Sequence, residues 1–146
     1  MTRPSRVVGH NSSVHRERID LDTSRRRVTD VTPFVGEFCR GRGDGLVNVF
    51  VPHATAGLAL MELGSGSDTD LDELVERLLP RDDRYVHAHG SRGHGADHLL
   101  PALLSPTIVL PVADGRPCLG TWQSVAFVDF NPDNPRRHLD LAFVPG

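Results

Sequence analysis

Residues 107–144 decide the fold class, and they read TIVLPVADGRPCLGTWQSVAFVDFNPDNPRRHLDLAFV. Apolar and polar side chains alternate over residues 122–130 and again over residues 138–144, as in strands that bury one face. A third strand is predicted over residues 107–112, and the Asp114–Gly115 pair that follows it indicates a tight hairpin turn. The last third of the chain is therefore predicted to be β-structure.

Helical spacing appears in the part of the chain that precedes this stretch. Between Asp68 and Pro80, five apolar residues recur at helical intervals, and aspartates in the first turn suit the positive end of the helix dipole. Two shorter helices are predicted over residues 29–39 and 96–104. Strands are also predicted over three earlier segments, namely 14–21, 46–51 and 57–63. Two or three helices with about six strands predict an α+β fold.

The length of the chain and its charge limit its organisation and its chemistry. The 146 residues suit a flexible N-terminal extension over residues 1–13 and a single domain over residues 14–146. The formal net charge of −3 argues against a nucleic acid or an anionic membrane surface as partner. All 16 basic residues are Arg, which excludes Schiff-base and P-loop lysines. The chain shows no secretory signal or membrane-spanning run, so a cytoplasmic location is expected, and Cys39 and Cys118 are both expected in the core.

Histidine is the first chemical signal in the sequence. Four of the eight histidines, His87, His89, His94 and His98, fall within twelve residues. Neutral imidazoles bind zinc and related metals, and a helix over residues 94–98 would place His94 and His98 on one face, although Gly95 disfavours that helix. The cluster is consistent either with a metal site or with an exposed loop that has no function.

Other candidates lie at strand ends and in short charged runs. His53 follows a buried strand and begins the sequence HATAG, which can either face a cleft or form a structural loop. Trp122 suits a core or a subunit interface, and arginines 25–27 and 136–137 suit either phosphate or a solvated face. The remaining polar candidates are Thr55, Glu62, Asp70, Asp72, Thr121 and Gln123.

From about Val14 onward the chain resembles the YjbQ-like family, uncharacterised protein family 47. Residues 53–56 are similar to the family's His-Thr-Ser/Thr-Ala, and residues 108–123, IVLPVADGRPCLGTWQ, look like its signature almost residue for residue. Three single residues also match family positions, namely Glu62, His87 after Tyr85, and His98. The resemblance implies a compact α+β pseudobarrel or β-sandwich that assembles as a homotrimer.

The resemblance also implies a function and departs from the family at two polar positions. Some members are assigned a secondary thiamine-phosphate synthase activity, which joins hydroxymethylpyrimidine diphosphate to thiazole phosphate and releases pyrophosphate. Met61 replaces a family asparagine and Leu100 a family lysine, and His94 lies near the place of a family acidic residue. The alternatives are a non-catalytic trimer that binds a metal or a small anion through histidines, and a metal-dependent phosphohydrolase.

These considerations together assign expected roles to individual residues. His53, His98 and Glu62 are predicted to be catalytic. Substrate contacts are expected from Thr55, Thr121, Trp122, Gln123 and Arg137. A divalent metal, Mg²⁺ or Zn²⁺, is expected on His53, His87 and His98. The expected partners are a small phosphorylated metabolite and two further copies of the chain.

Overall fold

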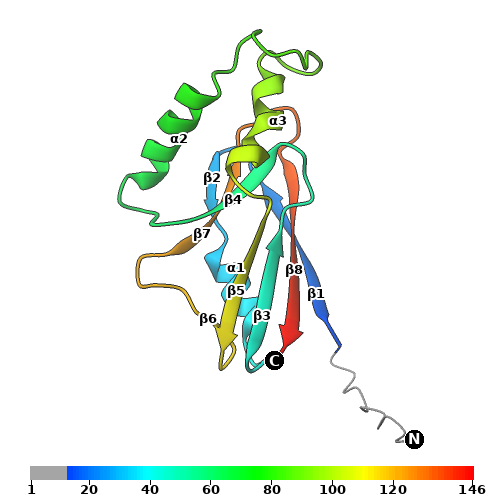
Figure 1. Cartoon of the computed structure of the whole chain (residues 1–146), viewed down its shortest axis with the longest axis vertical. Helices are drawn as coiled ribbons and strands as arrows, with labels where there is room; N and C mark the ends of the chain where they lie inside the picture. Colours follow the sequence, from blue (N-terminus) through cyan, green and yellow to red (C-terminus); the bar gives the residue numbers. More distant parts are fainter. Residues whose placement is uncertain (1–12) are drawn as a thin grey trace, which may run out of the picture.

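The computed structural model describes residues 13–146, in which two antiparallel sheets and three helices are formed (Figure 1). The extension predicted over residues 1–13 lies outside the described residues except for Ser13. The elements follow one another as β1 (His15–Asp22), β2 (Val28–Asp30), α1 (Thr32–Cys39), β3 (Gly45–Phe50), β4 (Ala56–Met61), α2 (Ser67–Leu78), α3 (His94–Leu103), β5 (Thr107–Ala113), β6 (Arg116–Pro117), β7 (Ser124–Asp129) and β8 (Arg136–Pro145). The predicted α+β class is confirmed.

Strand order brings the end of the chain into the middle of the larger sheet. That sheet has the order β1-β8-β3-β5-β6, and the smaller one has the order β2-β7-β4. In β8, Leu141 lies opposite Glu17 of β1 on one side and Val49 of β3 on the other. The predicted hairpin is present, because β5 pairs with β6 across a turn in which Asp114 and Gly115 both have positive φ. The C-terminal third therefore supplies strands to both sheets.

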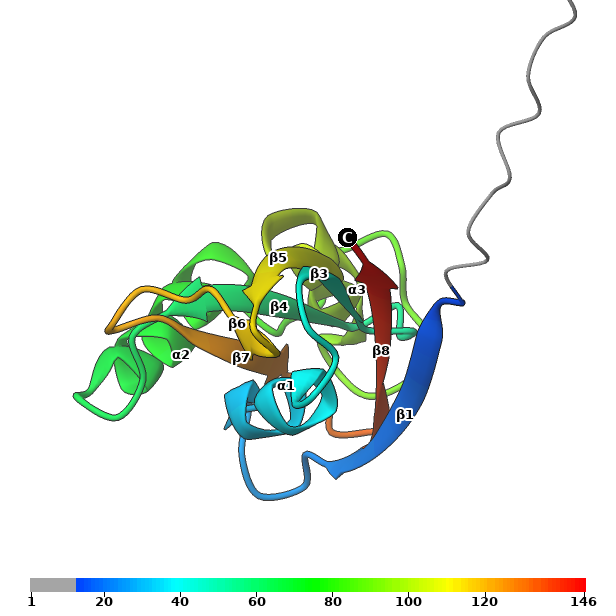
Figure 2. The same ribbon diagram turned by 90° about the horizontal axis from the view of Figure 1, so that it is seen from below.

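The main core lies between the two sheets. Inward-facing residues alternate along β8 and β3 on one side and along β7 on the other, as a period of two requires. Helix α1 packs against this core through Val35, Phe38 and Cys39, and Figure 2 shows it next to β7. The largest fully buried side chains of the core include Phe127, Phe143, Leu139, Leu141, Val47 and Val49.

A second, smaller core lies on the opposite face of the small sheet. Ala126 and Val128 of β7 pack there with Val75 of α2 and Leu100 of α3, so β7 is buried on both faces. Helix α3 comes very close to the sheet at its C-terminal end, because a Cβ at Gly57 would lie 2.1 Å from the carbonyl oxygen of Leu104. This contact fixes the position of α3, which carries two of the histidines, His94 and His98, in its first two turns.

Three sequence predictions are corrected by the structure. The helix predicted over residues 29–39 begins only at Thr32, because residues 28–30 pair with β7 as strand β2. The apolar stripe of α2 is only partly covered, and Leu78 remains 58% exposed because α2 stands to one side of the sheets (Figure 1). Cys39 is buried as predicted, but Cys118 is exposed in the loop after the edge strand β6.

The helices of residues 13–146 are all too short or too polar to cross a lipid bilayer.

Candidate metal centre

Four imidazoles meet at the start of α3. His87 and His89 come from the loop after α2, while His94 and His98 lie one turn apart in α3, on one face as predicted. One ring nitrogen of each histidine lies within 4.8 Å of the corresponding atom of the other three. The Nε2 atoms of His94 and His98 are 2.9 Å apart, within hydrogen-bond distance, so these two ring nitrogens face each other.

Glycines allow the loop to fold back over the helix. Gly90 and Gly93 have φ values of +81° and +77°, a region in which side chains with a Cβ are strained. Gly95 lies in the first turn of α3, where a Cβ would come 2.5 Å from the Cβ of Tyr85. The Tyr85 hydroxyl donates a hydrogen bond to the carbonyl oxygen of Pro80 at 2.9 Å, which fixes the loop. Gly95 is thus explained by close packing rather than by a break in the helix.

A carboxylate stands behind the buried His94, which is only 8% exposed. The Nδ1 atom of His94 lies 3.3 Å from Asp133 Oδ2 and 3.8 Å from Asp97 Oδ2, and it has no partner with hydrogen-bond geometry. Asp133, in the loop between β7 and β8, is itself oriented by the backbone N–H of Ser91, which it accepts at 3.0 Å. Metal-binding histidines commonly have such a carboxylate behind the nitrogen that does not bind the metal.

An ion pair ties the loop to the helix on the far side of His94. Arg81 donates two hydrogen bonds to the buried carboxylate of Asp97, at 3.1 and 3.0 Å, and a third to the hydroxyl of Ser91 at 3.3 Å. The charge of Asp97 is therefore balanced within the protein. This network holds Ser91, and through it the carboxylate of Asp133, against the first turn of α3.

Two imidazoles of the cluster, those of His87 and His98, favour the neutral form. Desolvation, and after it the neighbouring histidines, lower the pKa of both His87 and His98 below the ordinary value for histidine. A neutral ring nitrogen has a lone pair for a metal, whereas a protonated ring has none at that atom. The site can therefore accept a divalent metal near neutral pH.

His53 does not belong to this cluster in the described chain. Its Nε2 accepts the backbone N–H of His138 at 2.8 Å, and the two rings stack with their centroids 5.6 Å apart. His138 in turn places Nδ1 2.8 Å from Asp20 Oδ1. Of the predicted metal ligands, the structure thus brings together His87 and His98 and places His53 elsewhere.

The predicted substrate contacts are spread over other parts of the fold. Arg137 is buried and binds Asp129 at 2.8 Å and the hydroxyl of Thr55 at 2.9 Å, so these residues form one internal network. Glu62 is exposed just after β4. Thr121, Trp122 and Gln123 lie in the exposed loop before β7, where Trp122 is 73% exposed.

Two members of the cluster, His89 and His94, were absent from the predicted ligand set. The signal that could have found them is present in the sequence, since they belong to the run of four histidines within twelve residues. The family motif matches His53 and His98 and has an acidic residue near the position of His94. The prediction based on it therefore included His53 and left out His94.

Comparison with known proteins places the chain in a family. The family model for the UPF0047 protein YjbQ-like family matches residues 17–145. A UPF0047 protein of Mycobacterium tuberculosis H37Rv is 62% identical over 88% of this chain and 96% of its own length, and one of Archaeoglobus fulgidus is 37% identical over 82% and 94%.

Solved structures share the fold. A YbjQ-like protein of unknown function from Sulfolobus solfataricus superposes with a TM-score of 0.84 at 23% identity, over 92% of this chain and 99% of that one. A hypothetical protein of Aeropyrum pernix gives a TM-score of 0.81 at 31% identity, over 90% and 99%. With its family motifs and its fold both matched, the chain belongs to the UPF0047, or YjbQ-like, family, whose function is unknown.

Proposed function

We propose that this chain binds one divalent ion of the zinc class through His87, His89, His94 and His98. The supporting observation is that their ligand nitrogens lie within 4.8 Å of one another. Around a tetrahedral zinc with bonds of about 2.0–2.1 Å, ligand nitrogens are about 3.4 Å apart, so small side-chain rotations suffice. Magnesium prefers oxygen ligands, which makes zinc, nickel, cobalt or copper a better match than Mg²⁺.

The surroundings of the cluster suit a metal that remains accessible. His87 and His89 are exposed, and a cavity of about 150 Å³ adjoins them, lined also by Asp82 and Asp83. We infer that one of the two exposed loop histidines, His87 or His89, gives way to water while the other three histidines stay bound. Three protein ligands and one water form the usual catalytic arrangement of zinc.

The reaction class that follows is metal-dependent hydrolysis of a phosphate ester. A zinc-class ion held by these histidines would supply hydroxide near neutral pH, by lowering the pKa of a bound water, as the nucleophile toward phosphorus. The P–O bond to the alcohol breaks as the new P–O bond forms, and the departing alkoxide takes up a proton. A phosphate ester would enter through the cavity that His87, His89 and His94 line.

Thiamine-phosphate synthesis is the second candidate. The observation that favours it is the exposure of Trp122, which stands beside Thr121 and Gln123 in a loop that carries the family signature. The exposed side chains of Thr121 and Trp122 can contact a ligand or another subunit, whereas Gln123 Oε1 already accepts the backbone N–H of Gly120 at 2.8 Å. The joining of hydroxymethylpyrimidine diphosphate to thiazole phosphate is the specific reaction that tests this candidate.

We also propose that the chain assembles as a homotrimer. The outer face of the five-stranded sheet carries four apolar side chains around Asn48, and Leu46, Phe50, Val109 and Val144 are between 40% and 57% exposed. Leu46 lies opposite Val144 in the sheet, so the patch is continuous across strands. A second copy is the occupant that we expect here, and the outward Arg18–Asp140 pair beside Phe50 would border the contact.

The assembly is tested by native mass spectrometry. We expect a mass three times that of the 16.0 kDa chain. Val109→Glu should convert the trimer to monomers, because it places a charge in the apolar face. A wild-type mass of one chain at micromolar concentration would contradict the proposal.

The metal and the reaction are tested on the full chain. Chelator-treated protein is reloaded with Zn²⁺, Ni²⁺ or Mg²⁺ and assayed with 4-nitrophenyl phosphate and, separately, with the two thiamine precursors. The variant His94→Ala/His98→Ala should lose both the metal and the hydrolysis, and the control His15→Ala, on the exposed strand β1, should keep them. Metal binding without turnover would identify a non-catalytic metal protein, and thiamine phosphate formation would select the second candidate.

A further inference from the structure

We propose that a pocket lined by four arginines binds a phosphoryl dianion, either free phosphate or a small phosphate monoester. The pocket has a volume of about 340 Å³, and its wall includes Arg25, Arg26, Arg27, Arg81, Asp129 and Asn131. This site goes beyond the metal proposal and does not depend on it.

Two of the arginines are held in place with donors to spare. Arg27 stacks on the ring of Phe130 at 4.7 Å and pairs through Nη1 alone with Asp72 and Glu76. Arg81 uses Nε and Nη2 for Asp97 and Ser91. A guanidinium carries five N–H bonds, so Arg27 retains the hydrogens of Nε and Nη2, and Arg81 retains those of Nη1, without a partner among residues 13–146.

The other two arginines supply the uncompensated charge. Neither Arg25 nor Arg26 forms an ion pair within residues 13–146, whereas Arg27 and Arg81 are both paired with carboxylates. The one carboxylate in the wall, Asp129, is neutralised by Arg137 at 2.8 Å. Arg25 and Arg26 thus contribute two unpaired positive charges, but Arg27 is shared between two carboxylates, so the net excess is about one positive charge. This excess attracts a phosphate monoester, which carries −1.5 to −2 near pH 7.

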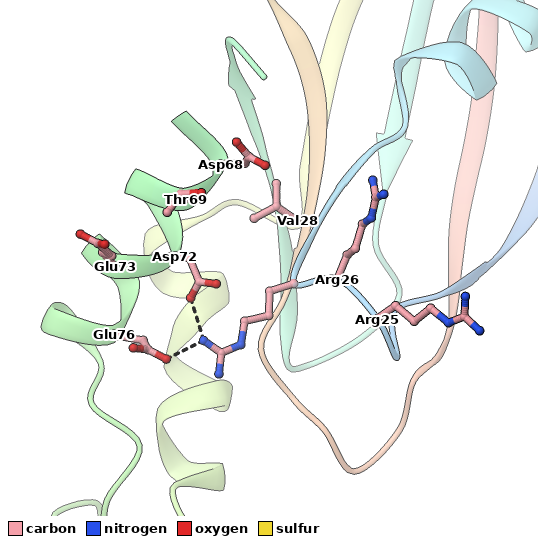
Figure 3. A pocket seen from close by; sticks show the side chains of 9 residues that line it. Arg25, Arg26, Val28, Asp68, Thr69, Asp72, Glu73 and Glu76 are labelled. Atoms are coloured by element: carbon pink, nitrogen blue, oxygen red, sulfur yellow. Dashed lines mark hydrogen bonds and ion pairs between the residues drawn. The ribbon is translucent and has the colours of Figure 1, made fainter. Parts of the chain in front are cut away.

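The neighbouring hollow shows why the anion is assigned to this pocket. That hollow, of about 640 Å³, also borders the arginine run but is lined by Asp68, Asp72, Glu73 and Glu76 of α2 (Figure 3). In Figure 3, Arg25 and Arg26 point away from these carboxylates. An anion would be repelled on the α2 side and attracted on the other.

The proposal is tested by calorimetric titration of chelator-treated protein with inorganic phosphate and with glycerol phosphate, at constant ionic strength. Saturable binding of one anion per chain is expected. Tighter binding of the ester would identify a phosphorylated metabolite as the ligand, and equal binding would identify phosphate itself. Absence of saturation at millimolar concentrations would overturn the proposal.

Matched variants separate this pocket from general electrostatic attraction and from the metal site. Arg25→Ala/Arg26→Ala should weaken phosphate binding by about tenfold or more, because charge-assisted contacts to phosphate are lost. Arg16→Ala/Arg116→Ala removes the same charge from exposed positions elsewhere and should weaken it less than about twofold. Equal losses in both would overturn the site. His94→Ala/His98→Ala should still bind phosphate, so failure of the metal proposal would leave this result intact.

Discussion

The sheet core and the four-histidine cluster are built by different means. In the core, Phe127 and Phe143 are completely buried within regular strands whose alternation is visible in the sequence. In the cluster, one histidine is buried, one is half-buried and two are exposed, and the loop that carries two of them depends on Gly90, Gly93 and contacts from a distant turn. The core is therefore specified by local pattern, and the site by contacts between segments far apart in the chain.

Because of this difference, folding and the proposed metal binding should be separable by mutation. Core side chains contact many neighbours, so their loss should be felt by the whole fold. The exposed histidines bury little apolar surface. Their loss should therefore weaken metal binding more than it lowers the free energy of unfolding.

The largest effect is expected in the core. Phe127→Ala should lower the free energy of unfolding by about 3–5 kcal/mol, because it removes a fully buried ring between the sheets. Urea denaturation of metal-free protein measures this change. Trp122→Ala, at an exposed position, is the control and should stay within about 0.5 kcal/mol of wild type. A similar cost for both would contradict the described core.

The next effect concerns a metal ligand. His98→Ala should cost metal-free protein only about 1 kcal/mol, for the lost hydrogen bond to His94, but weaken zinc binding by at least about 100-fold. At zinc concentrations near 100 times the wild-type dissociation constant, a 100-fold loss of affinity removes about 2.3 kcal/mol of the roughly 2.7 kcal/mol by which zinc stabilises the wild type. Thermal denaturation with and without zinc measures it. Full zinc stabilisation of the variant would show that His98 is not a ligand.

A smaller loss of zinc affinity is expected when a carboxylate that neighbours a ligand histidine is replaced. Asp133→Asn should weaken zinc binding by about 10–100-fold, since the carboxylate next to His94 Nδ1 loses its charge while an oxygen remains for the N–H of Ser91. Asp83→Asn, which changes the same charge on the exposed histidine loop, is the control. Equal zinc affinities of the two variants would argue against a role for Asp133.

The smallest effect is a pH dependence outside the cluster. Burial, and then the charges of Arg137 and His138, lower the pKa of His53, so the unfolded chain binds this proton more readily than the folded one. Stability should be complete above about pH 6.5 and fall as the pH drops through the lower folded pKa. The loss should stay under about 1 kcal/mol, because solvent screens a half-exposed ring.

His53→Gln provides the comparison for this pH effect. Glutamine retains an oxygen that can accept the backbone N–H of His138, but it does not titrate. Denaturation of metal-free protein between pH 5 and 7.5 should show a shallower slope for the variant. An unchanged slope would assign the pH dependence to other groups.

The fold was largely predictable where it depends on local pattern. Strands near residues 107–112 and 138–144 were predicted because alternation marks a half-buried strand, and each is present with slightly different ends. Strand β2 was missed because three residues carry no pattern of their own, and it exists only through pairing with β7. Such nonlocal pairing is not visible in a local window of sequence.

The site was predictable only in part. The sequence marked the histidine run and the shared face of His94 and His98. It could not show that Asp133, from the turn after β7, would stand behind His94, nor that His53 would bond to the backbone of His138. Both facts depend on the packing of segments that are distant in the chain.

The most direct test of the central proposal is the zinc content of the reconstituted protein. The full chain and the variant His94→Ala/His98→Ala are stripped with chelator, reloaded with zinc, freed of unbound metal and measured by inductively coupled plasma mass spectrometry. The proposal predicts one zinc per chain in the wild type and none in the variant. A wild type without zinc, or a variant that retains as much zinc as the wild type, would contradict it.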